Sequence, residues 1–508
     1  MSDPQLPTGQ PDAAEPTWPD ADTDPELAPP VRSPVTAKGV AVVGARVIAG
    51  AVGVAVAFAA VTASSFLPLP SYSVTPPGVS VTPVPALQQR ACAGPVLRLG
   101  GEMGEGATVV SAVGAPEVAH AASGGRVETV QFAATDESSG KAATVLTLPA
   151  PDDASHALFA GSQSQLVSAG TLAGLATANC AEAVSQAWLV GGSTATGRTT
   201  LVRLSNPGTV IATVSLSVFG ELGLVDAPGT DGIVVQPGSE RILSLAGLAP
   251  DLASPVVHVT SVGGRIVATL QQTTVRTLQA GGVDFVAPTQ APSRNMVIPG
   301  LVLSSHELIE HGGAIAGFED LAPTVRFFVP GKETAHARVV VSSESGASEP
   351  VTVTLDMAAG RTSELPLQEF ADGSYTVTID SDVPVVAGAR VSTMFDGGAN
   401  DFAWHAATLP VRERALVAVA PGPGAAMHLH NPTETDAAVT IAPSADATKT
   451  VTVPAGGSVA VAVGAGSAYE LSGFDALHVT VSYLGDGVVS NFTVTPPGPG
   501  SKPLLVYP

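Results

Sequence analysis

Apolar and polar residues alternate with a period of two along much of the chain. In the stretch "LVRLSNPGTVIATVSLSV", Val202 and Leu204 flank Arg203, and the alternation resumes after Pro207. Successive side chains of a strand point to opposite faces of a sheet, so this pattern predicts strands with one apolar face. Valine and threonine favour strands, and 54 glycines with 43 prolines indicate many turns. The sequence therefore predicts an all-β fold.

This stretch recurs twice, as "TVRFFVPGKETAHARVVV" from Thr324 and "AMHLHNPTETDAAVTI" from Ala426. The three copies align on a proline. In each copy the residue three positions before that proline is apolar, and the residue four positions before it is basic. We expect the apolar residues to point inward and the basic residues, Arg203, Arg326 and His428, to point outward.

The aligned prolines, Pro207, Pro330 and Pro432, are 123 and 102 residues apart, too far for a solenoid repeat. A unit of this size with about seven short strands is typical of a β-sandwich of immunoglobulin-like type. We predict tandem sandwiches over residues 188–280, 281–397 and 398–508, the second with an insertion over 301–320.

Each repeat is expected to close with a hairpin. The three sequences are "VVHVTSVGGRIVATL", "YTVTIDSDVPVVAGARV" and "LHVTVSYLGDGVVSNFTV". The dipeptides Gly263–Gly264 and Asp486–Gly487 have the residues that tight hairpin turns require.

A run of 20 residues near the N-terminus, "VIAGAVGVAVAFAAVTASSF" over residues 47–66, contains no charged residue. A helix of about 20 apolar residues matches the thickness of the hydrocarbon core of a bilayer. Arg32, Lys38 and Arg46 precede the run, and the next charged residue after it is Arg90. The positive-inside rule then predicts a single-pass protein of the cell membrane, with a cytoplasmic N-terminus and an extracellular C-terminal region.

The flanks of this span differ in character. Residues 1–37 are rich in acid and proline, which predicts a disordered cytoplasmic tail, and residues 38–66 combine a basic flank with the span. Residues 67–89 contain six prolines and no charge, which predicts an extended stalk. A signal peptide cleaved near Ala63, after "VTA", is the alternative to an uncleaved anchor.

The net charge limits the choice of partners. The chain has 44 acidic and 22 basic residues, a net charge of −22. Such a chain repels nucleic acid and anionic lipid, so we expect no nucleic-acid partner, and contact with the membrane only through the one helix.

The two cysteines, Cys92 and Cys180, lie in residues 90–187, which we predict to be a first β-rich module without a clear copy of the repeat. Structural zinc sites usually take four ligands, and no CxxC pair is present. In an oxidising compartment an even number of cysteines predicts a disulfide, Cys92–Cys180, and two free thiols are the alternative.

The stretch "SSHELIEHGG", residues 304–313, superficially resembles the metal-binding helix of a protease. In such a helix two histidines lie four positions apart on one face, whereas His306 and His311 are five apart. The stretch belongs to the insertion of the second repeat, and insertions usually form surface loops. We therefore expect a polar loop with a short helix from His306, capped by Ser305 and ended by Gly312.

Other features carry a family resemblance. They are the single hydrophobic run, the cysteine pair, "AWLVGGSTATG" beginning just before Trp188, and the "LxNPG" turn, although the second and third copies of that turn read "FVPG" and "HNPT". Together they resemble an uncharacterised actinobacterial family of membrane-anchored, secreted repeat proteins. The resemblance implies a gene often encoded beside a membrane glycosyltransferase, and it brings no catalytic residues with it.

The sequence thus predicts a non-enzymatic protein of the cell envelope, without a catalytic, metal or cofactor site. Its β-sandwich modules would serve as a structural, scaffolding or binding surface, with an envelope protein, a glycosyltransferase system or a wall polymer as partner. Trp188 and Trp404 lie in apolar contexts that favour core packing over a sugar-binding platform. The alternative function is an extracytoplasmic metal-dependent hydrolase that uses the His306/His311 loop.

Overall fold

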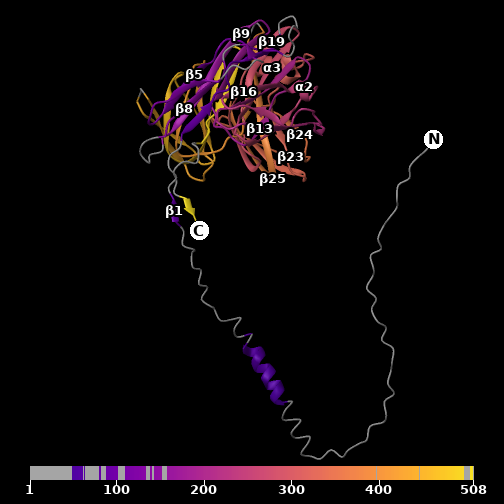
Figure 1. The fold of residues 1–508 in the computed structure, drawn as a ribbon, viewed down its shortest axis with the longest axis vertical. Helices are drawn as coiled ribbons and strands as arrows, with labels where there is room; N and C mark the ends of the chain where they lie inside the picture. The colour runs from indigo at the N-terminus through magenta and orange to yellow at the C-terminus, as the bar shows by residue number, and fades with distance from the viewer. Residues whose placement is uncertain are drawn as a thin grey trace, which may run out of the picture. The chain divides into compact units, whose positions relative to one another are not determined.

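The structure is a computed structural model. It describes residues 48–60, 62, 79–81, 87–100, 109–132, 138–139, 142–150, 157–395, 398–444, 447–496 and 504–506. The chain divides into two units, one of residues 1–78 with 507–508 and one of residues 79–506. In the first unit, residues 48–60 form a helix (Figure 1).

This helix lies inside the predicted span. The described helices nevertheless include none that qualifies as a membrane span. The predicted tail, residues 1–37, lies outside the described residues. Part of the predicted stalk is a strand, because β1 (Val79–Val81) pairs antiparallel with β34 (Leu504–Val506).

The described part of residues 79–506 consists mainly of antiparallel strands, which confirms the all-β prediction. The alternation in the sequence becomes alternation in burial. Along β13 (Ala212–Gly220), Ala212, Val214, Leu216 and Val218 are buried, and the residues between them are partly or fully exposed. Burying one such side chain contributes about 1.5 to 3 kcal/mol, which favours this register over one shifted by a residue.

The three repeats have equivalent sets of strands. The first repeat comprises β11 (Gln186–Val190), β12 (Arg198–Asn206), β13, β14 (Gly223–Leu224), β15 (Ile233–Val235), β16 (Ser239–Ser244), the short helix α2 (Leu245–Leu248), β17 (Val256–Gly263), β18 (Val267–Arg276) and β19 (Gln279–Val286). The second comprises β20 (Ser293–Leu303), helix α3 (His306–Gly313), the 3-10 helix η1 (Glu319–Leu321), β21 (Thr324–Phe328), β22 (Ala335–Ser343), β23 (Val351–Met357), β24 (Thr362–Pro366), β25 (Gly373–Met394) and β26 (Asn400–Ala406). The third comprises β27 (Val411–Ala418), β28 (Ala426–His430), β29 (Ala437–Pro443), β30 (Lys449–Val453), β31 (Ser458–Ala462), β32 (Ala468–Gly485) and β33 (Val488–Thr493).

Each repeat has two groups of paired strands, with a buried apolar cluster in each repeat. In the second repeat, β20 and β22 pair with the first half of β25, and β23 pairs with β22. The second half of β25 pairs with β21 and β26, and β24 pairs with β21. In the third repeat β32 takes the place of β25 and makes the equivalent pairs. In the first repeat two successive strands, β17 and β18, take this place.

This arrangement corrects two of the three expected hairpins. β25 is one strand of 22 residues that passes from one group of strands to the other, and no turn interrupts it. β17 and β18 pair with different partners on either side of Gly263–Gly264, so the chain changes sheets there instead of reversing. The hairpin at Asp486–Gly487 is confirmed, because β32 pairs with β33 and Gly487 has the positive φ of 71° that such a turn requires.

Strand pairing also moves the edges of the repeats. β19 extends beyond residue 280 and pairs with β18 of the first repeat. β26 begins after residue 397 and pairs with β25 of the second repeat. The predicted boundary at residue 280 cuts through β19, and the predicted boundary at residue 397 separates β26 from its partner β25.

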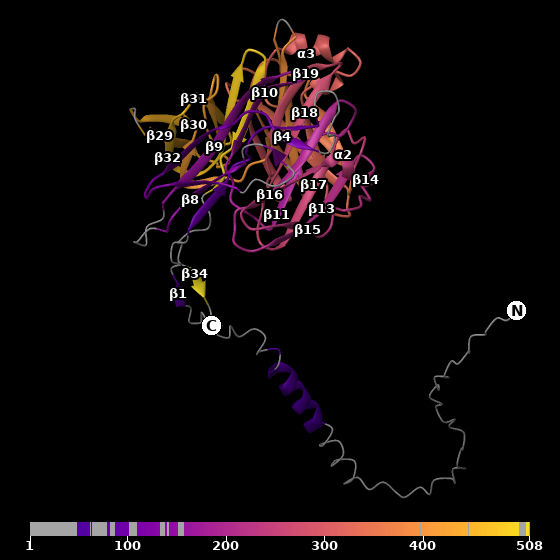
Figure 2. The ribbon, with the colours of Figure 1, turned by 45° about the horizontal axis from the view of Figure 1, so that its top comes forward.

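The first module precedes the repeats and is smaller. Its strands are β2 (Gln88–Ala91), β3 (Leu97–Leu99), β4 (Val110–Ala112), β5 (Glu117–Ala122), β6 (Glu128–Gln131), β7 (Ser138–Ser139), β8 (Thr144–Leu148), β9 (Phe159–Ala169) and β10 (Leu172–Asn179). They form three sheets of three strands, ordered β2-β8-β6, β3-β4-β7 and β10-β9-β5. Figure 2 labels four of these strands, β4, β8, β9 and β10.

One strand from each module meets at a shared centre. β10 contacts β19 and β33, and β26 contacts the same two strands. The first module and the third repeat, which are far apart in sequence, are therefore neighbours. β10, β19, β26 and β33 form a closed set of contacts, which we call the central strands.

Candidate functional site

The predicted loop of residues 304–313 is a surface element between β20 and β21. It contains α3, which begins at His306 as predicted, and His311 is exposed. The expected cap is wrong in its detail. Ser305 adopts a left-handed conformation and its hydroxyl donates to the carbonyl of Met394, while the carboxylate of Asp372 accepts the backbone N–H groups of Ser305 and His306. Asp372 therefore caps the helix from a distant part of the chain.

The two histidines do not converge. His306 Nε2 lies 4.0 Å from Glu310 Oε2, a spacing of one helical turn. The described residues contain no group of three His, Cys, Asp or Glu side chains positioned to hold a metal ion.

A pocket of about 280 Å³ lies beneath α3. Its apolar lining includes Leu303, Ile309 and Phe370, and its polar lining includes His306, Glu310, Glu319, Gln368, Asp372 and Ser392. The pocket therefore lies in the second repeat, between the insertion and the sheet beneath it. Apolar walls with polar groups among them are typical of a small-molecule site.

Asp320 attaches the insertion to the rest of the molecule. Its carboxylate accepts hydrogen bonds from Arg198 of β12, at 2.8 Å, and Arg276 of β18, at 2.6 Å, and it lies 3.5 Å from Arg390 of β25. Burial by itself would raise the pKa of Asp320, but the charges of Arg390, Arg198 and Arg276 outweigh it and hold the pKa well below its usual value. The insertion is thereby fixed to both the first and the second repeat.

The basic residues predicted to point outward are buried. Arg203, Arg326 and His428 are at most 4% exposed. Each strand that carries them is covered on both faces, because the neighbouring module packs on the face expected to meet solvent. Alternation with a period of two shows that a strand has one apolar and one polar face. It does not show whether the polar face meets solvent or another module.

Each of these residues reaches the preceding module. Arg203 pairs with Glu240 at 2.8 Å and donates to the carbonyl of Pro95 in the first module. Arg326 pairs with Glu364 at 2.8 Å and donates to the carbonyls of Gly192 and Pro255 in the first repeat. Because their charges are paired, both guanidinium groups can be buried at these interfaces.

His428 makes the equivalent contact in the third repeat. Its Nδ1 lies 2.5 Å from Glu344 of the second repeat, and its Nε2 lies 2.7 Å from the hydroxyl of Ser482. Serine, histidine and glutamate in this order are the components of a hydrolytic triad. All three are at most 6% exposed, and the hydrogen bond from His428 to Glu344 joins the third repeat to the second. We assign the arrangement to the interface between the two repeats.

Asp401 of β26 links all four central strands. Its Oδ2 accepts the backbone N–H groups of Leu175 in β10 and Val489 in β33, and its Oδ1 accepts that of Val283 in β19. Burial raises the pKa of Asp401 well above its usual value, although these hydrogen bonds oppose the shift. A Cβ atom at Gly174 would lie only 2.5 Å from Asp401 Oδ1, so glycine is required there for the carboxylate to approach β10.

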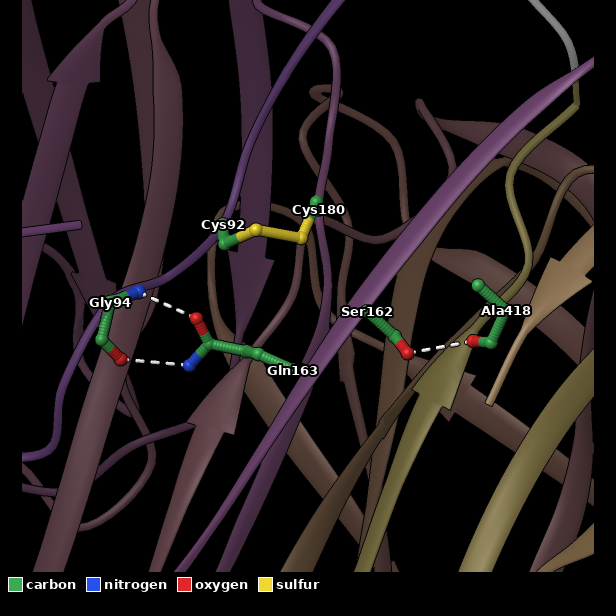
Figure 3. Close-up of a disulfide and its surroundings, with 6 residues drawn as sticks. All are labelled: Cys92, Gly94, Ser162, Gln163, Cys180 and Ala418. Atoms are coloured by element: carbon green, nitrogen blue, oxygen red, sulfur yellow. Dashed lines mark hydrogen bonds between the residues drawn. A yellow bond between two sulfur atoms is a disulfide. The ribbon is translucent and has the colours of Figure 1, made fainter. Parts of the chain in front are cut away.

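Cys92 and Cys180 form the predicted disulfide, and both are 1% exposed (Figure 3). The side-chain amide of Gln163 lies beside it and both accepts from and donates to the backbone of Gly94, at 2.8 and 2.7 Å. Ser162 donates to the carbonyl of Ala418 at 2.6 Å, which joins the first module to the third repeat. The disulfide thus lies where the chain closes on itself.

Comparison with known proteins places this architecture in a family. A family model described as "Family of unknown function (DUF5719)" matches residues 134–464, which run from the first module into the third repeat. The chain belongs to this family. No curated protein matches it. One solved structure, described as "Crystal Structure of Thermotoga maritima 1070", is similar over 23% of this chain and 95% of its own, at 16% identity and a TM-score of 0.19. That score is too low for the likeness to carry an argument about fold or function.

Sequence reasoning missed the asparagine of the "LxNPG" turn. Asn206 donates to the carbonyls of Val210 and Val235 and accepts from Gly208 N–H. Asn431, from "HNPT", makes the same kinds of contact in the third repeat. Asparagine directly before proline at the end of a strand could have predicted these contacts. An asparagine side chain in a turn forms hydrogen bonds with backbone groups that have no partner in a strand.

Proposed function

We propose that this chain is a non-enzymatic protein of the cell envelope, and that its β-rich region is a rigid scaffold that positions a partner at the outer face of the membrane. The proposal includes an N-terminal anchor over residues 47–66, an extracellular region of tandem immunoglobulin-like sandwiches, and an origin among actinobacteria. Its partner would be an envelope glycosyltransferase system or a wall polymer.

One observation carries the proposal. The four modules are joined by buried, directional contacts rather than by flexible linkers, and the carboxylate of Asp401 accepts from three neighbouring central strands. Buried hydrogen-bond networks of this kind hold one arrangement in preference to others, as a scaffold requires. The buried disulfide also favours an oxidising, extracytoplasmic compartment.

The test combines topology with partner capture. Protease added to intact protoplasts should digest the chain after residue 66 and spare residues 1–46. Chemical crosslinking followed by purification of the full chain should recover a membrane glycosyltransferase or wall polymer, and the same yield should be obtained from a His306→Ala/His311→Ala variant. Protection of the C-terminal region would refute the topology. Stoichiometric zinc that disappears in the double variant would favour the metal-dependent hydrolase instead.

A further inference from the structure

The pocket beneath α3 has walls of two kinds. Five of its lining residues are apolar, namely Leu303, Ile309, Ala322, Pro323 and Phe370. Three others carry carboxylates, Glu310, Glu319 and Asp372. The lining residues that the structure describes include no lysine or arginine, and the nearby Arg390 is directed to Asp320. The pocket therefore combines apolar surface with negative charge.

A second observation concerns a buried hydroxyl in the wall of the pocket. Ser392 lies on β25 and lines the same pocket, and it is only 2% exposed. Its hydroxyl has no hydrogen-bond partner among the described residues. A buried hydroxyl without a partner costs about 1 to 3 kcal/mol, so a ligand that supplies a partner is favoured at this position.

The three carboxylates differ in how many hydrogen bonds they already accept within the protein. Asp372 caps α3, and both oxygens of Glu319 accept from Gly317 N–H, at 3.0 and 2.9 Å. Hydrogen bonds from the backbone of Glu319 itself and of Gly317 lower the pKa of Glu319, so this carboxylate is ionised at neutral pH. The side chain of Glu310 is 77% exposed, and its Oε2 lies 4.0 Å from His306 Nε2. It is the carboxylate with most capacity for a ligand.

We propose that this pocket binds an amphipathic organic cation, an ammonium group on a short aliphatic stem. The stem contacts Leu303, Ile309 and Phe370, and the ammonium donates to the carboxylates and to Ser392 Oγ. The negative lining disfavours phosphates and carboxylates as ligands. The same chemistry is offered by a free alkylamine and by a lysine side chain of a protein partner.

The test is calorimetric titration of the full chain with n-pentylammonium, with n-pentanol and valerate as the uncharged and anionic controls. A ligand of this size should bind with a Kd of about 1 mM. Pentanol should bind at least about fivefold more weakly, and valerate should not bind. A lysine tripeptide with blocked ends, run in parallel, distinguishes a protein partner from a free amine by which of the two binds more tightly.

Two variants of one helix make the result specific. Glu310→Lys reverses a charge in the lining of the pocket. It should raise the Kd of pentylammonium at least about fivefold, because an attractive exposed charge pair becomes a repulsive one. Glu307→Lys makes the same change on α3 at an exposed residue outside the lining and should leave the Kd within about twofold. Ser392→Ala should also weaken binding, and an unchanged melting temperature of each variant would show that the fold is kept.

Equal affinity for pentylammonium and pentanol would overturn the proposal. Equal losses in the two lysine variants would overturn it too, because they would reflect general surface charge and not the pocket. Neither outcome bears on the scaffold proposal, which rests on the central strands and is tested by topology and partner capture.

Discussion

At the scale of single residues, buried polar groups decide which surfaces of this molecule meet. The two oxygens of Asp401 accept from the backbone of three different strands. Asp284 of β19 supports it from the neighbouring strand, since it accepts from Trp404 N–H and from the hydroxyl of Ser490. Burial raises the pKa of both carboxyls well above the usual value.

Asp401→Asn is expected to destabilise the protein. An asparagine offers one acceptor oxygen, and its amide nitrogen would face at least one of the backbone N–H groups of Leu175, Val283 and Val489. One buried N–H group without an acceptor costs about 1 to 3 kcal/mol. Denaturant unfolding of the variant should show a loss of that size.

Asp231→Asn is the matched control, since Asp231 is exposed. It should change the free energy of unfolding by no more than about 0.5 kcal/mol. An Asp401→Asn variant as stable as this control would show that the carboxylate is not needed to join the central strands.

At the scale of elements, the interface between the second and third repeats is unusual in its histidines. His405, His430 and His478 are at most 5% exposed, and burial lowers their pKa values to about 3, 4 and 3. Glu344 and His428 lie in the same interface as a hydrogen-bonded pair. These imidazoles are neutral in the folded protein and take up protons more readily when it unfolds.

Acid should therefore weaken the protein through this interface. A histidine whose folded pKa is depressed contributes its full stability above the unfolded pKa of about 6.5, and this is lost as the pH falls toward the folded value. For His405, with a folded pKa of about 3, the loss is about 1.4 kcal/mol per pH unit below 6.5. His405→Leu should remove this part of the slope, so that unfolding measured from pH 6.5 to 5 is less pH-dependent by about 2 kcal/mol in total.

His120→Leu is the control, since it makes the same substitution at an exposed histidine of the first module, outside this interface. The comparison between the two variants separates His405 from Asp284 and Asp401. Their raised pKa values change stability in the opposite direction, with more stability at lower pH. A His405→Leu variant with the parent slope would contradict the assignment.

The inserted element α3 is expected to tolerate loss of both its histidines. His311 is exposed and His306 is 37% exposed, and the helix is attached through Asp372, Asp320 and the buried Ile309 instead. His306→Ala/His311→Ala should therefore change the free energy of unfolding by no more than about 0.5 kcal/mol. Ile309→Ala, in contrast, should cost about 2 kcal/mol or more, because it leaves a cavity beneath the helix. A chelator-sensitive melting transition that the double variant lacks would contradict this prediction and indicate a metal.

At the scale of the whole molecule, the disulfide closes the first module near its contact with the third repeat. Cys92 and Cys180 are 88 residues apart, and a crosslink over such a loop stabilises a protein by about 4 to 5 kcal/mol in the chain-entropy model. Reduction should lower the free energy of unfolding by up to that amount, and denatured protein without reductant should show no free thiol. A reduced protein as stable as the oxidised one would show that the hydrogen bonds near Gly94 and Ala418 hold the closure without the crosslink.

The sequence by itself determined what depends on local pattern. Alternation defined the strands and the aligned prolines defined three related repeats, because the period of a strand and the needs of a turn are written in neighbouring residues. The start of α3 at His306 was predictable for the same reason, whereas the Cys92–Cys180 pair was predicted from the even number of cysteines. Trp188 and Trp404, assigned to the core, are 6% and 3% exposed.

Only the tertiary structure decided how the repeats meet. Arg203, Arg326 and His428 read as exposed because the pattern cannot show that another module covers their face. Three features depend on residues far apart in the chain. They are the pairing of β25 with both groups of strands, the capping of α3 by Asp372 and the contacts of Asp401. A group is buried only after the chain has folded around it. The shifted pKa values and the unpartnered hydroxyl of Ser392 are therefore properties of the folded protein. The charges and the pocket that support a function are therefore properties of the assembled modules, and no single stretch of the sequence contains them.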